Sequence, residues 1–368
     1  MKAYRDPSTS DPSPSGMDRR EFLQKAAAAA MAFSLPMPTK LFKEMRMGVV
    51  VHSYGSRWNS KVSSNKYPGF MNAIDLLEHC SRIGAGGIQV GVREWTTDFV
   101  EKMRDRREKL GLYLEGSISM PKDTGDLTRF EQEVKGAKEA GAQVIRTVCS
   151  AGRRYEIFHS LEAFQEAQKN AMTSLQLADP ILHKHKVRLA VENHKDWRAT
   201  ELAAMIKELD SEWIGVTLDF GNSISLMEDP LEVVETLAPY AFTTHVKDMG
   251  VDEYADGFLL SEVPLGRGIL DLTRMIAICN QHNPEITLNL EMITRDPLEI
   301  PCLKEDYWAT FGTLSGSELA RTLQMVRHHK FQPALPTVSQ LSSEDRLAAE
   351  EQNIIESFTY SKTILGLK

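Results

Sequence analysis

Cysteine is scarce in this sequence of 368 residues, and its four copies stand far apart. They occupy positions 80, 149, 279 and 302, with no Cys-x-x-Cys pair among them. Structural zinc sites and disulfide-rich folds both depend on closely spaced cysteines. The sequence therefore argues against a cysteine-based metal site and against a dense disulfide framework.

Basic residues and long apolar runs are lacking as well. Lys and Arg number 43 against 51 Asp and Glu, which gives a formal net charge of −8, and no stretch is dense in Lys or Arg. Nonspecific phosphate binding requires such a basic stripe, so nucleic acid is not an expected partner. No run of about 18 consecutive apolar residues follows the N-terminal region, so we expect no membrane span in the mature protein.

The N-terminal region has the composition of a targeting segment. Residues 1–16 are rich in Ser, Pro and Asp and show no periodicity, which predicts disorder. Arg19 and Arg20 precede Phe22-Leu23 and an alanine-rich run at 26–35, and this arrangement resembles a bacterial twin-arginine export signal. The alternative is an amphipathic helix start with two solvated arginines. We expect a leader over residues 1–38 and export to the periplasm, or a cytoplasmic protein if the signal does not function.

Eight short apolar runs recur after the leader, separated by segments with helical periodicity. The runs cover residues 47–52, 87–92, 112–116, 143–148, 187–192, 214–219, 241–246 and 287–291. Eight β-strands alternating with helices over about 246 residues predict an α/β fold of the (β/α)8 TIM barrel type. A doubly wound sheet is the rival, but residues 52–57 lack the Gly-rich loop that normally follows its first strand.

The rest of the chain fits a single domain. We expect the barrel over residues 46–330 and a C-terminal helical extension over 331–368. Helical patterns at 317–330 and 342–361 would close the outer ring of the barrel.

Four polar residues end successive strands in the second half of the barrel: Glu192, Asp219, His245 and Glu291. TIM-barrel active sites lie at the C-terminal ends of the strands. Taken singly, Glu192 could form a salt bridge at the rim, Asp219 could start a turn and His245 could be a core histidine. Together, three converging carboxylates need a neutralising cation. Carboxylate oxygens with one imidazole suit Mn²⁺, the ion we expect, with Mg²⁺, Co²⁺, Fe²⁺ or Zn²⁺ as alternatives.

These strand ends resemble those of a known superfamily. The series Val191-Glu192-Asn193-His194, Leu218-Asp219-Phe220-Gly221-Asn222, Thr244-His245-Val246-Lys247-Asp248 and Leu290-Glu291 resembles the sugar phosphate isomerase/epimerase branch of the xylose isomerase-like barrels. Residues 264–271 resemble the Gly-x-Gly-x-x-Asp stretch of that branch.

The resemblance implies that Glu192, Asp219, His245 and Glu291 are metal ligands and that the two glutamates are also the acid/base pair. Ketose 3-epimerases of this superfamily carry a substrate-binding His three residues after the metal Asp. Asn222 stands there in this sequence, which argues against a plain free-ketose 3-epimerase.

The expected activity is that of a metal-dependent sugar isomerase or epimerase, which abstracts a proton next to a carbonyl and forms an enediolate. The alternative is a lyase or dehydratase acting on a keto-sugar or 3-keto-glycoside with the same site. A metal-dependent phosphodiesterase of the endonuclease branch would need more histidines at the strand ends than this sequence offers. A sugar-binding protein without catalysis is a further alternative.

Four more residues are candidates for binding a small carbohydrate substrate: His194, Asn222, Lys247 and Arg146. Arg146 and Glu115 are both charges within apolar strands, and they could instead pair with each other. No cluster of Arg and Lys in the sequence indicates a phosphate pocket, so an unphosphorylated sugar or glycoside is expected. A homo-oligomer is possible.

Overall fold

The computed structural model describes residues 45–58, 64–150 and 152–368. The predicted leader and export signal, residues 1–38, lie outside the described residues. Within the described part, no helix combines the length and the apolar composition that a membrane span requires.

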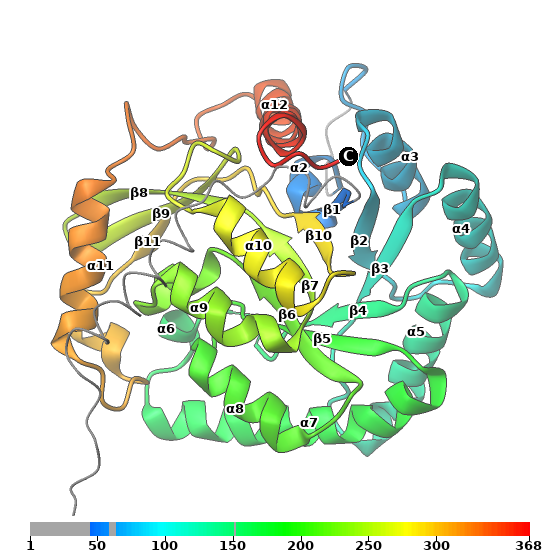
Figure 1. Ribbon diagram of the computed structural model, residues 1–368, viewed down its shortest axis with the longest axis horizontal. Helices are drawn as coiled ribbons and strands as arrows, with labels where there is room; N and C mark the ends of the chain where they lie inside the picture. Colours follow the sequence, from blue (N-terminus) through cyan, green and yellow to red (C-terminus); the bar gives the residue numbers. More distant parts are fainter. Residues whose placement is uncertain (1–44, 59–63, 151) are drawn as a thin grey trace, which may run out of the picture. The chain divides into compact units, whose positions relative to one another are not determined.

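Eight parallel strands close into a barrel in the order β1-β10-β7-β6-β5-β4-β3-β2 (Figure 1). The barrel strands are β1 (Met47–Val50), β2 (Gly87–Gly91), β3 (Tyr113–Ser117), β4 (Val144–Thr147), β5 (Arg188–Glu192), β6 (Ile214–Asp219), β7 (Ala241–Val246) and β10 (Thr287–Leu290). The predicted TIM barrel is confirmed. Because each strand is buried on both faces, its sequence is a nearly continuous apolar run.

Helices connect most of these strands and surround the barrel. They are α2 (Gly55–Trp58), α3 (Ala73–Ile83), α4 (Thr97–Leu110), α5 (Leu127–Glu139), α6 (Arg154–Ile157), α7 (Leu161–His185), α8 (Ala199–Leu209), α9 (Pro230–Leu237), α10 (Leu272–His282), α11 (Gly316–His328) and α12 (Ser343–Thr363). Short 3-10 helices occur at Val51–Tyr54, Thr124–Asp126, Asn222–Leu226, Ala238–Tyr240 and Glu305–Trp308.

Local sequence signals fix several helix ends. Helices α3 and α4 stop at Gly84 and Gly111, which adopt left-handed φ angles of 81° and 64° that suit glycine. Asn72 and Thr96 cap the N-termini of the same helices through their side chains. Asp126 precedes α5, but its carboxylate binds Arg129 at 2.6 Å and caps no N–H of that helix.

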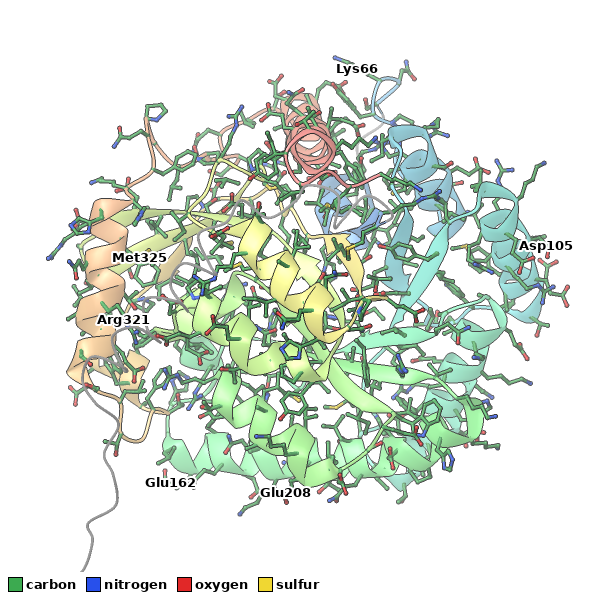
Figure 2. All side chains as sticks on the ribbon, viewed as in Figure 1. Lys66, Asp105, Glu162, Glu208, Arg321 and Met325 are labelled. Carbon is green, nitrogen blue, oxygen red and sulfur yellow. The ribbon has the colours of Figure 1, made fainter. Side chains whose placement is uncertain are left out.

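The helices turn charged faces outward and apolar faces toward the barrel. Asp105 on α4, Glu162 on α7 and Glu208 on α8 lie on the outside of the molecule (Figure 2). Val100 and Met103 on the other face of α4 are buried in the main core. This amphipathic pattern explains why the helical periodicity was readable from the sequence.

A second, antiparallel sheet was not predicted. It has the order β11-β9-β8 and consists of β8 (Asp248–Tyr254), β9 (Gly257–Val263) and β11 (Leu298–Ile300). Helix α11 packs on this sheet, and Val326 of α11 belongs to the same apolar cluster as Val251 and Leu260 (Figure 1). The expectation that α11 closes the outer ring is therefore wrong, because its apolar face covers the extra sheet.

Helix α12 does close the ring of helices. Ile354 and Phe358 belong to the main core, and the Glu350 carboxylate accepts the backbone N–H groups of Ser56 at 2.6 Å and Arg57 at 3.1 Å. The helix is thus joined to the start of the barrel, next to α2. The domain boundary at residue 330 stays a prediction.

Candidate metal centre and substrate cavity

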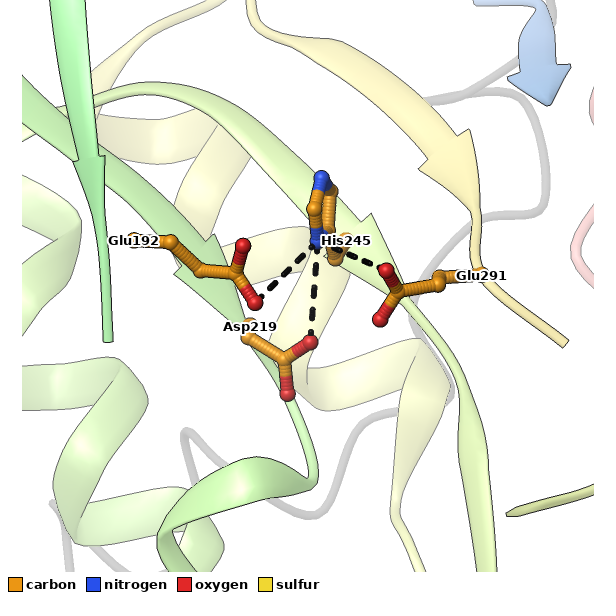
Figure 3. A group of neighbouring side chains, drawn as sticks. All are labelled: Glu192, Asp219, His245 and Glu291. Carbon is orange, nitrogen blue, oxygen red and sulfur yellow. Dashed lines mark ion pairs between the residues drawn. The ribbon is translucent and has the colours of Figure 1, made fainter. Parts of the chain in front are cut away.

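Four neighbouring strands bring the four predicted ligand residues together. Glu192 ends β5, Asp219 ends β6, His245 lies in β7 directly opposite Asp219, and Glu291 follows β10. Nδ1 of His245 lies 3.5 Å from Oε1 of Glu192, 3.8 Å from Oδ2 of Asp219 and 3.6 Å from Oε1 of Glu291 (Figure 3). One ligand atom from each of the four buried residues lies within 4.8 Å of all the others.

Two linked hydrogen bonds, from Gln89 to Glu115 and between Gln89 and His245, set the orientation of the His245 ring. Nε2 of Gln89 donates to the Glu115 carboxylate at 2.9 Å, so Oε1 of Gln89 must accept a proton from Nε2 of His245, 2.8 Å away. Nδ1 of His245 then faces the carboxylates, and no hydrogen-bond partner for it exists among the described residues. Burial lowers the pKa of His245, but Glu192 and Glu291 outweigh it and raise that pKa. A field that attracts a proton to Nδ1 also attracts a metal cation there.

Glu192 is held ionised at the side of the site. Burial favours its neutral form, but Arg146, whose Nε lies 2.6 Å from Oε2, and His245 hold the pKa of Glu192 well below its usual range. Nδ2 of Asn222 donates to the other oxygen of Glu192 at 3.0 Å. The two contacts fix the direction of both carboxylate oxygens.

Asp219 and Glu291 share the ammonium of Lys247. Its Nζ lies 2.8 Å from Oδ2 of Asp219 and 2.5 Å from Oε2 of Glu291. Burial raises the pKa of Asp219 despite this ammonium, whereas Lys247 and His245 overcome burial and hold the pKa of Glu291 well below its usual range. Arg146 and Lys247 are two cations against three carboxylates, so the group retains one net negative charge when His245 is neutral.

A cavity of about 270 Å³ opens beside this group. Three of the predicted substrate-binding residues line it, namely Arg146, His194 and Asn222, together with Glu291. Lys247 is not among the lining residues, because its side chain is buried between two carboxylates.

Sequence reasoning missed three cations of the cavity wall: Arg153, Lys195 and Arg295. Each lies in a segment that follows the C-terminal end of a barrel strand, after β4, β5 and β10 respectively. Their position just after the strand ends could have identified them in the sequence, because the active sites of TIM barrels lie at the C-terminal ends of the strands.

Arg146 and Glu115 do not pair with each other. Arg146 binds Glu192, whereas the buried Glu115 carboxylate accepts hydrogen bonds from Gln89, Thr243 and neighbouring polar side chains of β10. Burial raises the pKa of Glu115. Glu115 therefore belongs to the support of His245 rather than to the cavity.

The Gly-x-Gly-x-x-Asp stretch folds around a neighbouring carboxylate. Asp248 accepts the backbone N–H groups of Gly266 and Gly268, each at 2.9 Å, and of Leu270 at 3.1 Å. Gly266 has a φ of +83°, and a Cβ at Gly268 would collide with the Asp248 carboxylate. These glycines let the loop before α10 pack against Asp248, the residue next to Lys247.

The fold and the strand-end site define the class of this protein. A family model described as the xylose isomerase-like TIM barrel matches residues 77–332. The chain belongs to that family.

Comparison with individual proteins gives more distant similarities. A 3-oxo-isoapionate decarboxylase of Pectobacterium atrosepticum is 25% identical over 271 residues, which cover 71% of this chain and 92% of that protein. A xylose isomerase-like barrel protein from Mycobacterium smegmatis in complex with magnesium covers 76% of this chain and 98% of its own, with a TM-score of 0.53 and 16% identity. D-psicose 3-epimerase, crystallised in the presence of D-fructose, covers 88% of this chain and 100% of its own, with a TM-score of 0.57 and 14% identity. The two structural similarities show a shared fold.

Proposed function

We propose that the chain is a divalent-metal-dependent enzyme that forms an enediolate next to the carbonyl of a small carbohydrate, as an isomerase or epimerase. The observation that carries this proposal is the buried group of Glu192, Asp219, His245 and Glu291, in which Nδ1 of His245 has no hydrogen-bond partner among the described residues. Three carboxylate oxygens and one imidazole nitrogen fit Mg²⁺, Mn²⁺, Co²⁺ or Fe²⁺. The magnesium complex of the related Mycobacterium smegmatis protein supports such an ion here.

A bound divalent ion would polarise the substrate carbonyl and stabilise the negative charge of the enediolate. The residues of the chain supply the proton transfer. Glu291 is the ligand carboxylate that lines the cavity, so we assign to it the removal of the proton next to the carbonyl. Glu192 is assigned the return of a proton on the other side of the substrate, and because Arg146 holds it ionised it must first take up that proton from water, while Glu291 later releases its own to water. Return to the opposite face of the same carbon epimerises the sugar, and return to the neighbouring carbon isomerises it.

Lys247 and His245 favour the ionised form of Glu291, which is the form that can accept a proton. The charge of the enediolate then needs stabilisation of its own within the site. The two cations that accompany the carboxylates, Arg146 and Lys247, preserve that ionised arrangement during the reaction.

Decarboxylation is a second candidate, and it has its own support. The relative from Pectobacterium atrosepticum is a decarboxylase by name, and cationic side chains line the cavity of this chain. Cleavage of the bond between a carboxylate and the carbon next to a carbonyl releases CO₂ and leaves its electron pair as the same kind of enediolate. That step requires no base, only a later proton donor.

One experiment tests both candidates. Purified protein is stripped with a chelator, reloaded with Mg²⁺, Mn²⁺, Co²⁺, Fe²⁺ or Zn²⁺, and incubated in D₂O with ketoses, 3-keto-glycosides and 3-oxo sugar acids. Deuterium at the carbon next to the carbonyl without release of CO₂ indicates proton abstraction, whereas release of CO₂, with deuterium taking the place of the lost carboxylate, indicates decarboxylation.

The matched variants are Asp219→Asn at the ligand group and Asp105→Asn on the exposed face of α4. We expect Asp219→Asn to lose the bound metal and at least about 100-fold of the reaction rate, by analogy with the strong effects of disturbing metal sites. Asp105→Asn should behave like the unchanged protein. Absence of metal binding, or neither deuterium incorporation nor CO₂ across the panel, would refute the proposal.

A further inference from the structure

We infer that the substrate carries a carboxylate, and that the ammonium of Lys195 binds it in the cavity beside the metal-ligand group. The inference rests on the proposed function and narrows its substrate class to oxo acids of sugars. It begins from a buried ammonium that has no ion-pair partner among the described residues.

Lys195 is an unusual buried lysine. Its side chain is only 4% exposed and lines the cavity, and its Nζ contacts the amide oxygen Oδ1 of Asn222. Among the described residues, no carboxylate forms an ion pair with this ammonium, although the buried carboxylates of Glu262 and Asp219 are near enough to favour its charged form. A buried ammonium without an anionic partner is costly, so a protein retains one where a bound anion completes the pairing.

The other cations of the cavity wall differ in this respect, because each already has a carboxylate partner. The pairs are Arg146 with Glu192, Arg153 with Glu156, and Arg295 with Glu262. These arginines add positive potential to the cavity, but their charges are compensated locally. Among these four lining cations, Lys195 alone has no ion-pair partner in the described residues, so its ammonium is the one that a ligand can pair with.

The number of free charges favours a carboxylate over a phosphate group. One unpaired ammonium matches the single negative charge of a carboxylate, whereas a phosphate monoester carries a charge of about −1.5 to −2 at neutral pH. Burial and the nearby Lys247 lower the pKa of Lys195 to about 8. An anion in contact with Lys195 opposes that shift and keeps the ammonium protonated.

Asn222 connects the carboxylate-binding residue to the metal-ligand group. Its Oδ1 contacts Lys195, while its Nδ2 donates to Oε1 of Glu192 at 3.0 Å. A single side chain thus separates the two sites, and the cavity of about 270 Å³ is small. The carboxylate and the carbonyl of the substrate therefore belong to one small molecule, and a molecule with both groups is an oxo acid.

The test compares substrates that differ only in charge. The reaction rate is measured with oxo sugar acids, with the matching ketoses that carry CH₂OH in place of the carboxylate, and with the matching sugar phosphates. The proteins are the unchanged chain, Lys195→Met, Lys195→Arg, and the control Lys169→Met on the exposed face of α7. Melting temperatures of all four show whether each variant folds.

A charge-assisted hydrogen bond predicts that kcat/KM for the acid exceeds that for the neutral ketose by about 10- to 100-fold. We expect Lys195→Met to abolish this preference, Lys195→Arg to restore part of it, and Lys169→Met to keep it. Equal rates on acid and ketose in the unchanged chain would overturn the inference, as would a preference for the phosphate.

A binding measurement separates this inference from the proposed function. D-gluconate and its neutral analogue D-gluconamide are titrated into the metal-free and Mg²⁺-loaded protein by calorimetry. Tighter binding of gluconate that disappears in Lys195→Met supports the carboxylate site even if no substrate reacts. Turnover of sugars with no difference between gluconate and gluconamide would leave the proposed function intact and overturn the carboxylate site.

Discussion

Under the proposed function, replacing Gln89 with Met should weaken metal binding without touching a proposed metal ligand. In the native chain, Gln89 donates to Glu115 and accepts from Nε2 of His245 at 2.8 Å, which leaves the lone pair of Nδ1 directed at the carboxylates. Methionine is similar in length to glutamine but neither accepts this proton well nor binds Glu115. His245 would lose both its fixed tautomer and its fixed ring orientation.

The magnitude follows from these contacts. Loss of a residue that orients a metal-binding histidine typically reduces metal affinity 10- to 100-fold, or about 1.4 to 2.8 kcal/mol. Glu115 keeps hydrogen bonds from Thr243 at 3.0 Å and Asn289 at 3.1 Å, so it is not left without partners. The loss of folding stability should therefore stay near 1 to 3 kcal/mol, the cost of a broken buried hydrogen bond.

Competition of the protein with a fluorescent chelator measures the affinity for Mn²⁺ and Mg²⁺ directly. Thr243→Val is the matched control, because it removes one hydrogen bond to Glu115 and leaves the contact between Gln89 and His245 in place. We expect its metal affinity to stay within about twofold of the unchanged chain. If Gln89→Met folds and binds metal equally tightly, Gln89 does not set the orientation of His245 and the reasoning fails.

Two further predictions concern stability. Glu350→Gln replaces a carboxylate that accepts two backbone N–H groups of α2. We expect the free energy of unfolding, measured with urea, to fall by roughly 1 to 2 kcal/mol. An unchanged urea midpoint would show that α12 is held by its apolar face alone. Burial raises the pKa of Asp196 to about 7. The folded state therefore binds the proton of Asp196 more tightly than the unfolded state does. As pH rises from about 4 through 7, this proton is lost and the folded state loses stability. Asp196→Asn should reduce the fall in unfolding free energy between pH 5 and pH 8, and equal falls in both proteins would contradict this assignment.

The barrel could be predicted because its strands are simple in sequence. A strand buried on both faces, such as β6 with all six residues buried, is an apolar run that needs no knowledge of its partners. The extra sheet was missed because its strands mix apolar and acidic residues. Ala255 and Asp256 form the two-residue turn between β8 and β9, since Tyr254 pairs with Gly257, and the turn-forming Asp256 followed by Gly257 was the available hairpin signal.

In the site, too, residues marked by a local sequence pattern could be predicted, and residues placed by tertiary packing could not. Glu192, Asp219 and Glu291 could be found because each ends or directly follows a predicted strand, and the topology of the fold brings strand ends together. Arg153, Lys195 and Arg295 stand in segments whose paths depend on tertiary packing. Their convergence on one cavity could not be read from a sequence in which they lie far apart. For this reason the sequence, which has no local cluster of Arg and Lys, did not predict the cationic cavity wall.

Asn222 links the departure from the epimerase pattern to the charge of the cavity. Its amide donates to Glu192 and presents a single oxygen to the ammonium groups of Lys195 and, at 3.4 Å, Lys247. An imidazole at this position would become a competing cation when protonated and would offer only one acceptor nitrogen when neutral. The Asn222 amide is uncharged at any pH, so the ammonium groups of Lys195 and Lys247 can both lie beside it. The residue that argued against a plain ketose epimerase and the lysine that indicates an acidic substrate are therefore parts of one arrangement.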